Sequence, residues 1–442
     1  MDPSTSYIHK TSNIILQITS QFKHLLNKHN MSNINNLPSI PDSLTRHQKL
    51  IYEKIIRTVN DRPKSVETPH VVVITDLGKD YDDLTAMLVL KELHRLGAIK
   101  LEGFIANLTP EKKRAHLARK ALDSLRLEHI PVGLGTRGTE KEHEVAGWEF
   151  PKEIMGEEPY PPQKDGQKLL LELVENAEKG HYKLTFLLIS SLRDIHMFEK
   201  RLRPQDNSPH RLKSITSKVI LQGSYFLQHG FLEADRAAAN NDEDWAAAEG
   251  FHHFLSEQNI PSVVYTKNAA FDTPLNTNIF KQLADTGEIV GKALYDVQRP
   301  QNLDYYRGAC QNPPKYPGRT QKWFLENRST FYNTHPKSTP DEALPKSEGE
   351  DILKYCRVIV YDALAALGTS GDDILATLNV LQDPNYSAEV KHSKDHRIVG
   401  ISKAPNNISS SRASTKEKDM RETIEALMLG ALLDCKSKKV QE

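Results

Sequence analysis

Cysteine is scarce in this sequence, and long apolar runs are missing. The 442 residues include three cysteines, Cys310, Cys356 and Cys435, which are odd in number and far apart. A disulfide scaffold is therefore not expected, and a reducing compartment, the cytoplasm, is the favoured location. No stretch is long and apolar enough to span a bilayer, so no membrane partner is expected.

An excess of charge of one sign is also missing. Lys+Arg and Asp+Glu both number 58, so the formal net charge is zero. Proteins that bind nucleic acid normally carry a basic excess that neutralises phosphates, and no nucleic-acid partner is expected here. The composition, 26% charged and 38% hydrophobic, is that of a globular protein.

The N-terminal segment is nearly free of acidic residues. None occurs between Asp2 and Asp42, and apolar residues recur there at helical spacing. This partly resembles a mitochondrial targeting peptide, but the first arginine is Arg46, and such peptides are usually rich in arginine. We expect residues 1–68 to form a helical or irregular extension, with a second helix over about 44–59, that docks on the body or on a partner.

From His70 onwards, short apolar runs alternate with amphipathic ones. The β-branched run VVVIT reads as a buried strand, and DDLTAMLVLKELHRLG as a helix that Gly97 can end. Further strands are expected at KLEGFIAN, IPVGLG, KLTFLLIS, SKVILQG and IPSVVYT, and further helices at 110–127, 244–258, 351–367, 372–381 and 417–433. An insertion that is irregular or locally helical is expected at 299–350, and a hairpin or loop at 384–416. The alternation predicts an α/β domain over residues 69–442, with an open, mostly parallel, Rossmann-like sheet covered by helices.

The segment VVVITDLGKDYDDLTA places four carboxylates beyond the end of a strand. Asp76 follows the strand directly, and Asp80, Asp82 and Asp83 follow a turn that contains glycine. Ligands of open parallel sheets bind beyond the carboxyl ends of the strands. Converging carboxylates repel one another, and Ca²⁺ accepts about six to eight oxygen ligands, so a calcium site is predicted. Capping of the helix by Asp82 and Asp83 is the simpler alternative, but it leaves the other two aspartates unexplained.

Six segments, in order along the chain, resemble the inosine-uridine nucleoside hydrolase family. They are DLGKDYDDLTA (76–86), GFIAN (103–107), LLISSLRDI (187–195), VILQGSY (219–225), NNDEDWAAA (240–248) and VIVYDALAAL (358–367). The YDDL and NNDED forms, the TKNAA turn and the long N-terminal extension look closest to the nucleoside-hydrolase-like effector proteins of plant-pathogenic bacteria. The resemblance covers about residues 70–370 and implies the nucleoside hydrolase fold.

The resemblance also implies a reaction and a set of site residues. The reaction is hydrolysis of the N-glycosidic bond of a ribonucleoside or related ribosyl compound, with Ca²⁺ as cofactor and an aspartate that deprotonates the attacking water. The residues carried over are the calcium ligands Asp76, Asp82, Asp83, Asp362 and the carbonyl of Ile189, the catalytic residues Asp82 (the base) and Tyr361, and the substrate-binding residues Asp80, Asn107, Asn240 and Asp244. Because family members commonly assemble, a homo-oligomer is implied.

Two positions depart from the family pattern. Tyr361 stands where many purine-cleaving members have a histidine that can protonate the leaving base. A tyrosine, with an ordinary pKa of about 10, is a weaker acid, although it can stack on a base or donate a hydrogen bond to it. Ala238 stands where the family has a ribose-contacting glutamate, for which Glu233 or Asp235 could substitute. Two alternatives to an enzyme therefore stay open: a non-catalytic protein that binds ribosyl or ADP-ribose ligands, and a partner-binding protein that acts through its N-terminal extension.

Overall fold

The computed structural model describes residues 38–204, 208–228, 231–381, 395–400 and 416–441. The amphipathic helix expected near the N-terminus lies outside these residues. Residues Pro41–Glu442 form one compact unit. It includes α2 (Arg46–Asn60), the second helix expected within the extension 1–68. None of the helices in the described ranges is long and apolar enough to cross a bilayer.

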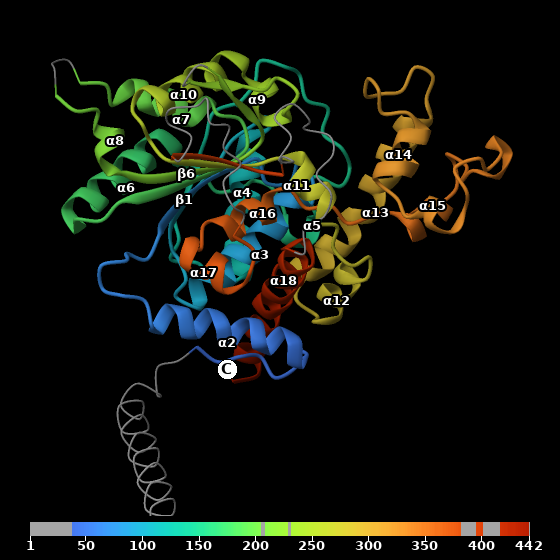
Figure 1. The fold of residues 1–442 in the computed structure, drawn as a ribbon, viewed down its shortest axis with the longest axis horizontal. Coiled ribbons are helices and arrows are strands. Elements are labelled where there is room, and N and C mark those ends of the chain that lie inside the picture. The colour runs from blue at the N-terminus through green and yellow to red at the C-terminus, as the bar shows by residue number, and fades with distance from the viewer. Residues whose placement is uncertain (1–37, 205–207, 229–230, 382–394, 401–415, 442) are drawn as a thin grey trace, which may run out of the picture. The chain divides into compact units, whose positions relative to one another are not determined.

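Eight strands form one sheet, and every neighbouring pair is parallel (Figure 1). The order is β10-β9-β6-β5-β1-β2-β3-β4. The strands are β1 (His70–Thr75), β2 (Lys100–Ala106), β3 (Val132–Leu134), β4 (Lys164–Asp165), β5 (Leu184–Ile189), β6 (Thr216–Gln222), β9 (Ser262–Tyr265) and β10 (His396–Val399). The predicted open, parallel α/β sheet is confirmed. The order runs outward in opposite directions from β1 and β5, so the ends of these two strands mark the place where such sheets bind ligands.

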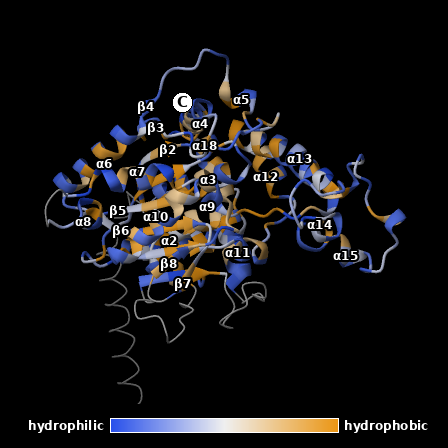
Figure 2. Ribbon diagram, turned by 90° about the horizontal axis from the view of Figure 1, so that it is seen from above, coloured by the Kyte–Doolittle hydropathy of each residue, from blue (hydrophilic) through white to orange (hydrophobic). Residues whose placement is uncertain are grey.

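The central strands are buried on both faces, as their continuous apolar sequences predicted. Val72 and Ile74 of β1 belong to the core shared with one layer of helices. That layer contains α6 (Gly166–Gly180), α7 (Arg193–Arg201) and α10 (Trp245–Glu257). Apolar and polar residues alternate along α6 in Figure 2, because one side of this helix packs on the sheet and the other faces solvent. Side chains of a strand point alternately to its two faces, so Val71 and Val73 point to the opposite layer.

The opposite layer is built around α3, which is almost entirely buried. Its helices are α3 (Asp82–Arg95), α16 (Asp362–Gly368), α17 (Asp372–Thr377) and α18 (Lys416–Gln441), and α2 packs on α17 and α18. Every residue of α3 from Asp82 to Leu93 is buried. Two buried contacts fix its neighbours: Lys91 Nζ lies 2.6 Å from a carboxylate oxygen of Asp434 in α18, and the hydroxyl of Tyr52 in α2 donates to Glu92 at 2.7 Å. The C-terminal part of α3 is therefore held by α2 and α18.

The remaining elements lie in the connections and in the insertion that precedes α16. They are α4 (Glu111–Ser124), α5 (Lys152–Met155), α8 (Arg211–Ile215), the hairpin β7 (Tyr225–Gln228) and β8 (Phe231–Ala234), α9 (Ala239–Glu243), α11 (Lys267–Asp272), α12 (Ile279–Asp285), α13 (Ile289–Cys310), α14 (Gln321–Asn327), α15 (Phe331–Thr334) and the 3₁₀ turns η2 (Asp341–Ala343) and η3 (Asp351–Tyr355). The insertion has its own apolar core, which includes Tyr306, Phe324 and Phe331.

Residues 299–350 are partly helical and partly irregular, as expected, and aromatic side chains from α13, α14 and α15 pack together there. Two other sequence-based expectations for the C-terminal half were wrong. The single helix expected over 351–367 is broken between η3 and α16, where Val358 pairs with Leu275 in an isolated β-bridge. The hairpin or loop expected over 384–416 contains β10, which adds a parallel strand beside β9.

Candidate active site

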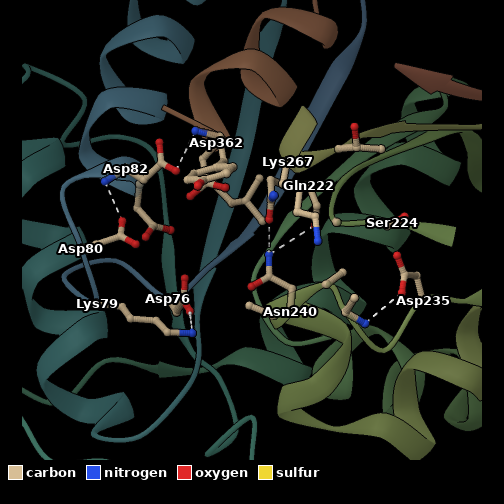
Figure 3. Close-up of a pocket in the computed structure, with 18 of the residues that line it drawn as sticks. Asp76, Lys79, Asp80, Asp82, Gln222, Ser224, Asp235, Asn240, Lys267 and Asp362 are labelled. Atoms are coloured by element: carbon tan, nitrogen blue, oxygen red, sulfur yellow. Dashed lines mark hydrogen bonds and ion pairs between the residues drawn. The ribbon is translucent and has the colours of Figure 1, made fainter. Parts of the chain in front are cut away.

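A cavity of about 250 Å³ opens beyond the carboxyl ends of the central strands (Figure 3). Its walls come from the residues after β1, β5 and β6 and from the starts of α3, α11 and α16. Eight of the ten residues predicted for the site line it: Asp76, Asp80, Asp82, Asp83, Ile189, Asn240, Tyr361 and Asp362. The structure thus brings together residues that are up to 286 positions apart, taking Asp76 and Asp362 as the extremes.

Asp80, Asp82 and Asp83, which lie just before and at the start of α3, are held by hydrogen bonds that orient their carboxylates. Asp82 Oδ2 accepts a hydrogen bond from the backbone N–H of Tyr361 at 2.7 Å. Asp80 Oδ1 accepts one from the backbone N–H of Asp82 at 2.8 Å, and Asp83 accepts one from the hydroxyl of Thr75. The N-cap residue of α3 is Tyr81, whose side chain makes no capping hydrogen bond, and the first backbone N–H of the helix is bonded by Asp80, not by Asp82 or Asp83. Simple helix capping therefore does not account for the aspartates.

Positive charge near these carboxylates is limited. Lys79 Nζ lies 3.3 Å from Asp76 Oδ2 and 2.9 Å from Glu243 Oε1. The contact with Asp76 is an ion pair without hydrogen-bond geometry, because Asp76 Oδ2 is a buried oxygen that accepts no hydrogen bond. Burial alone would lower the pKa of Lys79. The carboxylates of Asp76 and Glu243 outweigh burial, so the pKa of Lys79 is raised above its ordinary value. Lys79 is thus protonated, and its charge is paired with the carboxylates of Asp76 and Glu243.

The other aspartates remain electrostatically strained. Burial raises the pKa of Asp80, Asp82, Asp83 and Asp362, and the neighbouring aspartates raise it further. A cation in the cavity would relieve both effects, since it replaces lost hydration and screens the mutual repulsion. Carboxylate and carbonyl oxygens are the ligands that Ca²⁺ prefers, so the residues present fit this ion.

The carboxylates form a wall of the cavity and not a closed cage. Among the residues that the structure describes, no three Asp, Glu, His or Cys side chains already surround a metal position. Ca²⁺ tolerates such an arrangement because its flexible shell can include water and ligand oxygens. Ile189 is the last residue of β5, where it pairs with Thr75 of β1, and it lines the same cavity as the aspartates.

Two predicted substrate-binding residues do not line the cavity. Asn107 is fully buried, and its amide nitrogen donates to Asp194 Oδ2 at 2.8 Å, which ties the end of β2 to α7. Asp244 caps α10 by accepting a hydrogen bond from the backbone N–H of Ala247 at 3.1 Å, and it also pairs with Arg193. Both residues support the loops that surround the cavity.

Across the cavity from the aspartates lies a second polar wall. Asn240 Nδ2 donates to the side-chain carbonyl of Gln222 at 2.8 Å (Figure 3). Ala238 also lines the cavity. Of the two acids that could substitute for the family glutamate at this position, Asp235 lines the cavity and Glu233 does not. Asp235 is therefore the acid of this loop that is placed to contact a ligand.

Three basic residues of the cavity were not singled out from the sequence: Lys79, Lys267 and Arg319. Arg319 comes from the insertion, where its guanidinium stacks on the ring of Trp323 at 4.1 Å. A long-range fold contact brings it to the cavity, so no local motif could have identified it. Lys267 lies in the TKNAA turn, whose sequence suggested only a resemblance.

Tyr361 has an aromatic and cationic environment. Its ring meets Phe271 edge-on at 6.2 Å, and the guanidinium of Arg328 lies 5.8 Å from it. Burial raises the pKa of the Tyr361 hydroxyl, and Arg328 offsets only part of this effect. The hydroxyl therefore stays protonated at neutral pH, where it can donate a hydrogen bond.

A buried arginine braces the turn that carries Asp76. Arg114 is 0% exposed. It donates to the backbone carbonyl of Asp76 at 3.2 Å and to the carbonyl of Thr109 at 3.0 Å, and it pairs with Glu149 at 2.9 Å. Gly78 lies in the same turn with φ of +97°, and a Cβ there would lie 2.5 Å from the backbone oxygen of Glu149. The turn is packed so closely that only glycine fits.

Comparison with known proteins finds the fold but no close relative. No family model matches the chain, and no curated protein matches it. Among solved structures, the type III effector protein XopQ, in complex with adenosine diphosphate ribose, is 19% identical with a TM-score of 0.67; the match covers 88% of this chain and 100% of XopQ. The effector protein XOO4466 is 18% identical with a TM-score of 0.66, covering 88% and 99%. A plant nucleoside hydrolase, PpNRh1, shows a weaker likeness, at 11% identity and a TM-score of 0.48, covering 82% and 99%. The chain therefore has the fold of the nucleoside-hydrolase-like effector proteins, as its motifs predicted.

Proposed function

We propose that the protein binds a ribosyl compound in this cavity and hydrolyses its N-ribosidic bond with the help of Ca²⁺. The observation that carries the proposal is the arrangement of the cavity. Asp76, Asp82, Asp83 and Asp362 line it at the reversal of strand order, with Asn240 on the facing wall. Cleavage of an N-glycosidic bond develops positive charge on the sugar, and a wall of carboxylates favours that charge.

The residues that would hold the ion are Asp76, Asp82, Asp83, Asp362 and the carbonyl of Ile189. Bound Ca²⁺ would supply a chelating centre for the vicinal hydroxyls of the ribose and an oriented, more acidic water. The aspartates then keep two further tasks: they stabilise the positive charge that develops on the sugar, and they fix the ribose against one wall of the cavity. Asn240 contributes from the other wall, where its amide nitrogen is engaged with Gln222 and its carbonyl oxygen can accept from a ribose hydroxyl.

Asp82 is the proposed general base. Its Oδ2 is occupied by the backbone N–H of Tyr361 at 2.7 Å, whereas Oδ1 has only a 3.4 Å contact with the hydroxyl of Thr85. Oδ1 can therefore take the proton of the attacking water while the water oxygen bonds to C1′ of the ribose. The bonding electrons of the broken C1′–N bond leave with the base, to which the Tyr361 hydroxyl can donate a hydrogen bond.

A second candidate is ribosyl binding without turnover. Two observations favour it: the hydroxyl of Tyr361, whose pKa is raised by burial, is a poor proton donor to a leaving base, and Ala238 leaves the usual glutamate position without a carboxylate. The structurally similar XopQ holds ADP-ribose in its solved complex. Action through the N-terminal extension remains a separate prediction, since residues before 38 lie outside the described ranges.

The test combines turnover with binding. Purified protein is incubated with ribonucleosides and their 5′-monophosphates, with and without a calcium chelator, and released ribose or ribose phosphate is measured. Calcium binding is followed in parallel by calorimetry and by thermal unfolding. Asp82→Asn is compared with Asp285→Asn, which changes an exposed aspartate paired with Lys281 on the surface.

Each outcome has a defined meaning. Release that needs calcium, and that Asp82→Asn abolishes while Asp285→Asn does not, supports hydrolysis. Calcium-dependent binding of ribosyl compounds with no release from any of them supports the second candidate. Failure of the wild-type protein to bind any ribosyl compound in the presence of calcium rules out both.

A further inference from the structure

Two basic residues, Lys267 and Arg319, line the cavity in addition to Lys79. Lys267 lies at the start of α11. Figure 3 shows it beside Gln222, on the far side of the cavity from Asp76 and Asp80. Arg319 reaches the same cavity from the insertion. A ligand whose sugar lies against the aspartates therefore shares the cavity with two further cationic side chains.

These two cations lack the partners that the third cation of the cavity has. Lys79 pairs with Asp76 and Glu243. By contrast, no ion pair joins Lys267 or Arg319 to a carboxylate anywhere in the part of the chain that the structure describes. Both side chains are half-buried, so they have lost part of their hydration without gaining an anion. Partial desolvation of an unpaired charge is unfavourable, and an anionic ligand would offset it.

Arg319 is also prepared for this task by its packing. Its guanidinium stacks on the indole of Trp323 at 4.1 Å. This contact limits the positions that the guanidinium can take, and its planar fork of N–H donors matches the oxygen atoms of a phosphate. Lys267 adds a compact charge to the same cavity from a different element.

We infer that Lys267 and Arg319 bind the phosphate or diphosphate group of the ribosyl ligand, which makes the preferred ligand a nucleotide-type compound and not a plain nucleoside. This inference rests on the proposed function, because the ribosyl end must lie against the aspartates. It assigns a specificity role to the insertion, which contributes one of the two cations.

A simpler alternative is that the two cations only balance the charge of the aspartates. The two alternatives predict different ratios between the affinity for a nucleotide and the affinity for the matching nucleoside. Charge balance would affect nucleosides and nucleotides alike, whereas phosphate recognition affects the ratio of their affinities. The ratio is therefore the quantity to measure.

The experiment compares adenosine, inosine and uridine with their 5′-monophosphates, and includes ADP-ribose, by calorimetry in the presence of calcium. The full chain is used as wild type and as Arg319→Gln, Lys267→Gln and Arg319→Lys. Lys322→Gln is the matched control, because Lys322 is an exposed lysine of α14 outside the cavity. All variants are first checked for an unchanged thermal midpoint.

The wild-type protein should bind a 5′-monophosphate at least about tenfold more tightly than the matching nucleoside. Each glutamine variant should reduce that ratio about tenfold, toward unity, which is the lower end of the range for a charge-assisted hydrogen bond. Arg319→Lys should retain part of the preference, and Lys322→Gln all of it. The preference should weaken as salt is raised from 0.05 to about 0.5 M, because the attraction between charges is screened.

A wild-type ratio near one, or a ratio that the glutamine variants leave unchanged, overturns the inference but leaves ribosyl binding in place. A loss of affinity that is equal for nucleoside and nucleotide supports the charge-balance alternative and also overturns the inference of phosphate binding. If none of these ligands binds, the proposed function and the inference fall together.

Discussion

Replacing Arg114 with methionine should destabilise the fold strongly. The side chain is 0% exposed and donates to carbonyls of two connections as well as pairing with Glu149. Methionine fills most of the same volume, so the loss of packing is small. The main cost is the carboxylate of Glu149, which stays buried without a guanidinium and keeps only the imidazole of His143 and the backbone N–H of Ala146, both at 2.8 Å. Removing one member of a buried pair costs ~3–5 kcal/mol in unfolding free energy.

The assay is urea unfolding followed by circular dichroism, with the free energy taken from the midpoint and slope. The control is Lys113→Met at the preceding position, where the side chain is exposed and lies 3.4 Å from Glu158. It should change the unfolding free energy by less than ~1 kcal/mol, as is usual for exposed pairs. The double variant Arg114→Met with Glu149→Gln should lose less than the sum of the single variants, because neither charge is then left alone.

The same variant should also weaken calcium binding, because the brace on the carbonyl of Asp76 is lost. A loss below ~1 kcal/mol for Arg114→Met, or strict additivity in the double variant, would refute the description of this pair as a buried brace.

Three further perturbations have defined expectations. Gly78→Ala should lower the unfolding free energy in urea by ~2 kcal/mol or more, because φ is +97° and the new Cβ would lie 2.5 Å from a backbone oxygen. The control is Gly147→Ala, whose Cβ would meet nothing within 4 Å and which should change the unfolding free energy by less than ~0.5 kcal/mol. Equal costs for the two variants would contradict the close packing of the turn. The second perturbation is Glu199→Gln. Burial alone would raise the pKa of Glu199, but hydrogen bonds from His196 and Arg203 outweigh burial, so the pKa of Glu199 is lowered. Its stabilisation is therefore present above the unfolded pKa of about 4.5 and is lost as pH falls through the lower folded value, so Glu199→Gln should cost ~1–3 kcal/mol at pH 7 and less near pH 3.5; a cost that does not depend on pH would argue against this assignment. Tyr52→Phe should lower the unfolding free energy by ~1–2 kcal/mol, because a buried carboxylate of α3 loses its 2.7 Å donor; hydrogen exchange should show faster opening of α2, and unchanged exchange would contradict it.

The sequence predicted best where the site is local. Asp76, Asp80, Asp82 and Asp83 lie within one strand-turn-helix segment, so the strand end and the helix start fix their common position. Asp362 could be joined to them only through its resemblance to a family motif, because no local pattern links it to β1. The strand order, with β1 and β5 adjacent, then places all of them at one cavity.

The sequence predicted poorly where long-range packing decides. Arg319 reaches the cavity from an insertion whose aromatic residues pack together, and composition suggested an irregular or locally helical segment without indicating where it would lie. Asn107 ends β2 as the motif implied, but a buried hydrogen bond to Asp194 takes up its amide. An extended stretch around Val358 interrupts the helix expected there, since Val358 pairs with a distant backbone.

The burial of α3 has a consequence for synthesis of the chain. Lys91 in α3 and its partner Asp434 in α18 are 343 positions apart. At about 5–20 residues per second, a ribosome needs ~20–70 s to make the intervening chain. During that time the helix that carries Asp82 and Asp83 lacks its cover, and its buried lysine and glutamate stay in water. The wall of aspartates is therefore among the first parts of the structure to be made and among the last to be completed, so premature termination before α18 should leave a nascent chain that chaperones retain.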